Sequence, residues 1–155
     1  MNFKNIIKYF TLIFIGLGIG LSLLFGVEYT CKGSNEMFPD YYGNPFIFKQ
    51  ESLGSSLEYY FSLTGIILNT LFWTIILIGL RLIILKIIKI SNNNKFIIYS
   101  YRLITLVLIL FTILNIYISY LEMGMSFNQI ELYWDMNKEA QVYGLICEGE
   151  WFFMF

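Results

Sequence analysis

The feature that most constrains the fold of this chain is a long stretch without any charged side chain, residues 59–80. As a helix, these 22 residues rise about 33 Å, which is enough to cross a hydrocarbon core of about 30 Å. The stretch continues into residues 81–89, where isoleucines and leucines separate three cations. We therefore expect a membrane-spanning helix with an amphipathic, cytoplasmic extension, together covering about residues 56–90.

Two further uncharged stretches lie on either side of this helix, at residues 9–27 and 103–121. Each is long enough to approach the hydrocarbon thickness, so we expect helices over about residues 6–27 and 95–122. A basic start followed by an apolar run is also typical of a cleaved secretory signal. Because residues 25–28 lack a small-x-small cleavage site, an uncleaved first helix is the favoured interpretation.

The composition agrees with a chain surrounded largely by lipid. Hydrophobic residues make up 57% and charged residues only 14%, whereas soluble domains carry about 25% charged residues. The sequence therefore predicts an all-α integral membrane protein, one domain over residues 1–155 with three transmembrane helices. Residues 28–55 and 123–155 are then a loop and a tail, which we expect to form a small, aromatic-rich, partly irregular extracytoplasmic cap.

The distribution of charge predicts how the chain is threaded. Lysine and arginine near membrane ends are retained in the cytoplasm, and both basic zones of this chain reach the same side if there are three crossings. The N-terminus is then cytoplasmic and the C-terminus extracytoplasmic in a multi-pass protein of the cytoplasmic membrane. We also expect five cations of the second zone to contact anionic lipid headgroups: Arg81, Lys86, Lys89, Lys95 and Arg102.

The chain has two cysteines, Cys31 and Cys147, and this threading places both outside the cytoplasm. In an oxidising compartment they are able to form a disulfide that joins the loop to the tail. The alternative is a pair of free thiols that pack as small hydrophobic groups. The sequence leaves both alternatives open.

Small and polar residues within the apolar stretches indicate where helices pack. Asn69 lies near mid-membrane and should point inward, with Thr112 or Asn115 as its hydrogen-bond partner. These polar residues form either a polar path for a solute or a set of interhelical hydrogen bonds. No acid, base or proline lies between the ends of the helices, which favours the hydrogen bonds. Small residues that allow close helix approach are Gly16, Gly18, Gly20, Ser22, Gly26 and Gly65.

Local signals also suggest structure within the cap. Ser55 and Glu58 resemble a capping box, which predicts that the second helix begins near Ser55. In the tail, Ser126 and Gln129 form a similar pair and predict a short helix to about Tyr143. Alternation of apolar and polar side chains over residues 130–135 is typical of a strand and is the alternative, but the helix is the favoured interpretation.

No motif for catalysis, cofactor binding or metal binding is present. The chain has no histidine, and no spacing selects a catalytic pair among the carboxylates of Glu28, Asp40, Glu58 and Glu122. The favoured hypothesis is therefore a non-enzymatic accessory or scaffolding subunit, without a cofactor, that engages a protein partner or a second copy of itself through the aromatic cap. The alternative is a small oligomeric transporter or channel component. Membrane lipid is an expected partner and nucleic acid is not, because the basic cluster is short and lies against lipid.

Overall fold

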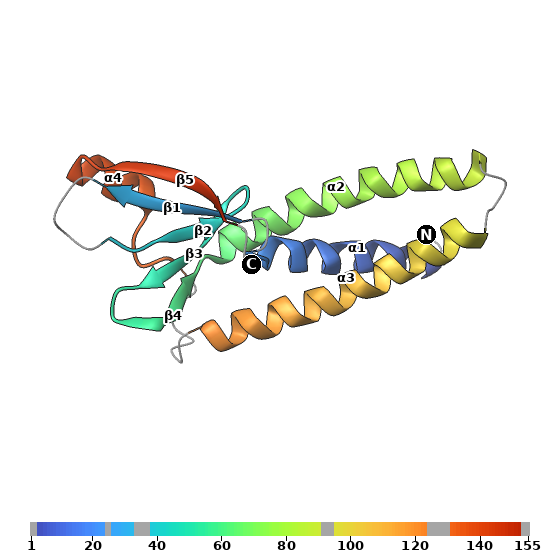
Figure 1. Cartoon of the computed structure of the whole chain (residues 1–155), viewed down its shortest axis with the longest axis horizontal. Coiled ribbons are helices and arrows are strands. Elements are labelled where there is room, and N and C mark those ends of the chain that lie inside the picture. The colour runs from blue at the N-terminus through green and yellow to red at the C-terminus, as the bar shows by residue number, and fades with distance from the viewer. Residues whose placement is uncertain (1–2, 24–25, 33–37, 91–94, 124–130, 153–155) are drawn as a thin grey trace.

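The computed structural model describes residues 3–23, 26–32, 38–90, 95–123 and 131–152. Within these residues, three long helices lie side by side, and a five-stranded sheet with a short helix stands at one end of them (Figure 1). The elements are α1 (Phe3–Leu21), β1 (Gly26–Lys32), β2 (Tyr41–Gly43), β3 (Ile47–Ser52), β4 (Ser55–Phe61), α2 (Leu63–Ile90), α3 (Lys95–Glu122), α4 (Met136–Tyr143) and β5 (Ile146–Phe152).

The sheet is antiparallel throughout, with strand order β4-β3-β2-β1-β5. Its first four strands follow one another as a meander, and β5 from the C-terminal part of the chain adds to the free edge of β1. Cys31 of β1 lies directly opposite Cys147 of β5, and their sulfur atoms are bonded at 2.04 Å. Of the two alternatives for the cysteines, the disulfide is thus the one that the protein adopts.

The expectation of an all-α protein with three transmembrane helices is wrong. Among the described residues, two helical segments are long and apolar enough to cross a membrane, Leu63–Ile87 in α2 and Lys95–Glu122, which is all of α3. The first uncharged stretch divides between a helix and a strand, because α1 ends at Leu21 and β1 begins at Gly26. Its apolar helical part, Ile6–Leu21, rises only about 24 Å, which is short of a hydrocarbon core of about 30 Å.

The expected start of the second helix at Ser55 is also wrong, because Ser55–Phe61 forms β4. Ser52 pairs with Ser55 across a two-residue turn that contains Gly54, so the chain reverses there and returns as a strand. Pairing with β3 outweighs the local capping signal, and α2 begins only at Leu63. In the described residues 26–32 and 38–61, the expected loop is therefore four paired strands.

The tail contains both a helix and a strand. Asp135 caps α4 by accepting hydrogen bonds from the backbone N–H groups of Asn137 and Lys138. Gly144 ends the helix in the left-handed region at φ 64°, after which the chain enters β5. The expected capping pair Ser126 and Gln129 lies outside the described residues.

The three long helices approach one another closely through glycines of α1, which lies between α2 and α3 (Figure 1). Gly16 and Gly20 face α2, where a Cβ atom built at Gly20 would lie 3.1 Å from the Cβ of Asn69. Gly18 faces α3, where a Cβ atom would lie 2.6 Å from the Cα of Thr112. Because glycine has no Cβ atom, α1 is able to approach both neighbouring helices closely at these positions.

Two other small residues expected in the first helix lie beyond its end. Ser22 is buried just after α1, and its backbone N–H donates to the carbonyl of Ile19 at 3.1 Å. Gly26 begins β1 opposite Phe152, so it takes part in sheet pairing and not in helix packing. Both differences follow from the early end of α1.

We predict that Gly18→Ala destabilises the protein by about 1–3 kcal/mol, because the added methyl group overlaps Thr112 and forces the two helices apart. Gly79→Ala is the matched control, since no atom lies within 4 Å of a Cβ atom built there. Its unfolding free energy should stay within about 1 kcal/mol of that of the unmodified protein. Denaturant unfolding in detergent micelles measures both, and equal effects of the two substitutions would contradict the described helix contact.

Candidate functional site

The sheet is joined to the helices by an amide that pairs with the backbone of a turn. Asn69 of α2 is fully buried, and its Oδ1 accepts a hydrogen bond from the N–H of Phe46 at 2.9 Å. Its Nδ2 donates to the carbonyl oxygen of the same residue at 2.8 Å, so the side chain imitates a strand neighbour. Four residues further along α2, the indole N–H of Trp73 donates to the carbonyl of Asn44 at 3.0 Å. The turn between β2 and β3 is therefore held against α2.

A glycine of α2 allows this close contact. A Cβ atom built at Gly65 would lie 2.9 Å from the Cα of Phe48 and would overlap the carbonyl group of Ile47. Gly65 therefore lets α2 approach the backbone of β3, in place of the helix-to-helix contact expected from the sequence. The β3 backbone continues this connection, since the carbonyl of Phe48 accepts the N–H of Ser62 at 2.8 Å.

The two polar residues of α3 that were expected to pair with Asn69 bond to their own helix. The hydroxyl of Thr112 donates to the carbonyl of Leu108 at 2.8 Å, and Nδ2 of Asn115 donates to the carbonyl of Phe111 at 2.9 Å. The expected bond from Asn69 to one of these residues is replaced by its bonds to Phe46. These three polar residues are therefore not joined into a continuous polar path.

An ion pair between a buried lysine and a partly exposed glutamate forms the second connection between sheet and helices. Lys49 of β3 is 2% exposed, and its Nζ lies 2.7 Å from Oε2 of Glu122, the last residue of α3. The ammonium group also lies 3.7 Å from the ring centroid of Tyr59 and 5.6 Å from that of Tyr42. Burial lowers the pKa of Lys49, while the hydrogen bond and charge of Glu122 oppose that change. The pair joins α3 to β3, and removal of Glu122 would leave the buried ammonium group without a counter-charge.

The same face of the sheet carries several carboxylates and tyrosines. Glu28 lies opposite Tyr42, and Tyr42 lies opposite Lys49, so the register places all three on one face. Glu28 is also opposite Glu150, and Glu51 is opposite Tyr59. We name this surface the carboxylate–tyrosine face, with the members Glu28, Asp40, Tyr42, Lys49, Glu51, Tyr59 and Glu150.

The carboxylates of this face repel one another. Burial raises the pKa of Glu28, and the charges of Asp40, Glu51 and Glu150 raise it further. Burial likewise raises the pKa of Asp40. Lys49 is the one cation among these seven members, and it is already paired with Glu122, whereas Lys32 lies at the far end of β1, four residues from Glu28. The face therefore has an excess of negative charge that a cationic ligand would offset.

The opposite face of the sheet is covered by the tail. The backbone N–H of Trp134 donates to Oε1 of the buried Gln50 at 3.2 Å, and the rings of Tyr60 and Tyr133 stack at 5.9 Å. Burial raises the pKa of Tyr41 to about 12, with a contribution from the negative charges of Glu139 and Asp135. This face therefore belongs to the core of the cap.

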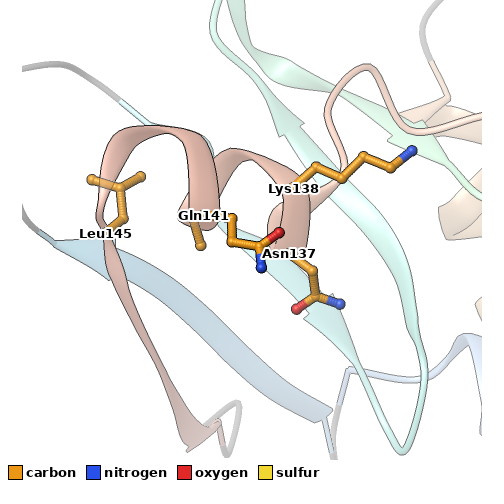
Figure 2. Close-up of a pocket in the computed structure, with 5 residues that line it drawn as sticks. Asn137, Lys138, Gln141 and Leu145 are labelled. Carbon is orange, nitrogen blue, oxygen red and sulfur yellow. The ribbon is translucent and has the colours of Figure 1, made fainter.

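A pocket of about 430 Å³ lies at α4, lined by Asn137, Lys138, Ala140, Gln141 and Leu145 (Figure 2). Asn137 and Gln141 are four residues apart on α4, and in Figure 2 the side chain of Lys138 extends away from their amides. Amides donate and accept hydrogen bonds but do not act as an acid, a base or a nucleophile at neutral pH. This lining therefore offers polar contacts without a catalytic pair.

The predicted lipid-contacting cations lie at the end of the helices that is distant from the sheet (Figure 1). Arg81 is half-buried, with its guanidinium group 5.8 Å from the ring centroid of Tyr9. Lys86, Lys95 and Arg102 are exposed, whereas the side chain of Lys89 lies outside the part of the chain that the structure describes. In the described residues, no group of three or more acidic or cysteine side chains is arranged to hold a metal ion.

Sequence reasoning missed Lys49, Tyr42 and Tyr59. The available signal was the order of residues after the turn, where Phe48 and Gln50 alternate with Lys49 and Glu51 as in a strand. The contact of Lys49 with Glu122 joins residues 73 positions apart and leaves no local pattern.

We predict that the stability of the protein falls as the pH rises from about 4.5 through the raised pKa of Glu28. In this range the folded protein keeps a proton that the unfolded chain, with the ordinary pKa of 4.5, has already lost. Glu28→Gln should flatten this part of the pH profile and raise the melting temperature at neutral pH. Thermal unfolding in detergent at a series of pH values measures both. Glu131→Gln, at an exposed position in the tail, is the control, and an equal pH slope in both variants would contradict the prediction.

Comparison of the chain with protein-family models, with curated proteins and with solved structures found no match. The function of this protein therefore has to be inferred from the chemistry of its own residues.

Proposed function

We propose that this protein is a membrane-anchored, non-enzymatic scaffold that binds a basic segment of a partner protein through the carboxylate–tyrosine face. The observation that carries the proposal is the excess of carboxylates on a sheet face that is held rigidly against the helices. Its support has three parts, namely the exposure of the apolar helices, the position of the cations, and the chemistry of the face.

The membrane anchor is supported by the exposure of α2 and α3. Only 11% of the most apolar part of each helix is buried within the protein, whereas the core helix of a soluble protein is mostly buried. Leu71 and Ile75 of α2 and Leu110 of α3 are each more than half exposed. Contiguous apolar surface of this extent is rare on soluble proteins, and lipid is its natural environment.

The position of the cations supports an orientation with the sheet outside the cytoplasm. Arg81, Lys86, Lys95 and Arg102 lie at the end of the helices distant from the sheet, and such cations are retained on the cytoplasmic side (Figure 1). The disulfide between β1 and β5 lies on the sheet side, and an oxidising compartment outside the cytoplasm would preserve it.

The chemistry of the face supports a basic protein segment as the ligand. Tyrosines are enriched at protein interfaces because they offer a large, rigid contact area with a polar end. Tyr42 and Tyr59 lie among four carboxylates, so the side chains of lysine or arginine would meet both negative charge and aromatic rings. An enzymatic role is not favoured, because the buried amine of this face, Lys49, is bound by Glu122.

The proposal predicts a selective loss of binding when the charge of the face is reduced. Glu28→Gln with Glu51→Gln should weaken the binding of a lysine–glycine repeat peptide about five- to tenfold, since each exposed charge pair contributes up to about 1 kcal/mol. Glu131→Gln with Glu139→Gln is the matched control, because it removes the same charge from the tail segment, away from this face. Fluorescence titration in detergent at low salt measures the affinities.

Equal losses in the two double variants would contradict a localised binding face. In native membranes, a photoreactive residue at position 28 should also cross-link to a partner through a basic segment, while the same residue at position 131 should not. Release of the protein from membranes by alkaline carbonate would contradict the membrane anchor independently of the binding result.

A further inference from the structure

A groove of about 560 Å³ lies between α1, α2 and α3 at the end of the helices that is distant from the sheet. Its inner part is apolar, with Ile15 of α1, Leu77 of α2 and Leu108 of α3 among the lining residues. Lys8 and Arg81 line it nearer the basic end of the helices. Lys8 and Ile15 are seven residues apart on α1, so the groove extends about 10 Å along the helix axis.

The two threonine hydroxyl groups that line the groove are hydrogen-bonded to backbone carbonyls. Thr11 Oγ1 donates to the carbonyl of Ile7 at 2.9 Å, and Thr105 Oγ1 donates to the carbonyl of Tyr101 at 2.8 Å. Each threonine thereby satisfies its hydroxyl donor within its own helix. The lining therefore favours a hydrocarbon chain over a polar solute.

The charge at this end of the helices is uniformly positive. The sequence contains no acidic residue before Glu28 and none between Glu58 and Glu122, the stretches that form this end of the protein. Arg81 is half-buried beside the ring of Tyr9, and Lys8 lines the same groove from α1. These two cations are placed to meet one anionic group at the end of an apolar groove.

We propose that this groove binds an anionic phospholipid, with an acyl chain between the three helices and the phosphate against Lys8 and Arg81. Basic pockets between membrane helices on the cytoplasmic side are suited to anionic headgroups, with about 1 kcal/mol from each cation near the surface. The site differs from general attraction to the membrane surface because the apolar groove selects one lipid position. It rests on the proposed placement of α2 and α3 in a membrane.

The size of the groove favours an acyl chain over a packed helix as its occupant. A helix with its side chains is about 10–12 Å wide and fills about 500 Å³ per turn, so a groove of this size would hold barely one turn. An acyl chain is thinner and flexible, and it is able to follow the inner surface from Arg81 towards Leu108.

Native mass spectrometry of the purified protein in detergent tests the proposal, with phosphatidylglycerol and phosphatidylcholine of identical acyl chains as probes. Phosphatidylglycerol should bind with one high-affinity site, and Arg81→Gln should weaken it about fivefold. Arg102→Gln is the control, because Arg102 is exposed and does not line the groove.

Ile104→Trp should fill the groove and remove the site, whereas Ile113→Trp should retain it, since both residues are exposed on α3 but only Ile104 lines the groove.

Several results would overturn the proposal. Equal binding of the two lipids, equal losses in Arg81→Gln and Arg102→Gln, or full binding in Ile104→Trp would each remove the site. A dimer that disappears only in Ile104→Trp would identify a second copy as the occupant instead. Circular dichroism and the intact disulfide establish that each variant is folded. Lipid binding is measured in detergent, whereas membrane anchoring is measured by carbonate extraction. Failure of the lipid site is therefore distinguishable from failure of the membrane anchor.

Discussion

The architecture depends on the pairing of one side-chain amide with one backbone residue. Without Asn69, the N–H and carbonyl of Phe46 would lose their hydrogen-bond partner on α2, and a buried polar group left unsatisfied costs about 1–3 kcal/mol. With Asn69, the turn between β2 and β3 lies against α2, and β3 then carries Lys49 to the end of α3. The orientation of the carboxylate–tyrosine face relative to the helices follows from these two contacts.

The features that local patterns determine were predictable from the sequence. The apolar character of α2 and α3 follows from uncharged stretches that are longer than the core helix of a soluble protein needs. The basic end of the helices follows from the positions of lysine and arginine in the sequence. The disulfide was one of two open alternatives, because both cysteines lie on the same side of those helices. Asn69 was recognised as an inward-facing residue, since an amide in lipid needs a partner.

The sheet was not predictable from local patterns, because its pairings are distant in sequence. Cys31 and Cys147 are 116 positions apart, and the strand that contains Cys147 pairs with β1 from the C-terminal part of the chain. At Ser55 a helix-capping signal and a strand compete locally, and pairing with β3 decides between them. The same dependence on distant partners hid the bond of Asn69 to Phe46 and the ion pair of Lys49, so the candidate site emerged only from the fold.

The most direct test of this account is the hydrogen exchange rate of the Phe46 amide, measured by NMR on the protein in detergent micelles. If Asn69 accepts this N–H within a buried contact, the amide should exchange as slowly as the central amides of α2 and should become fast in Asn69→Ala. Exchange of Phe46 in the unmodified protein at the rate of the exposed turn amide of Gly54 would contradict the docking of the sheet on the helices.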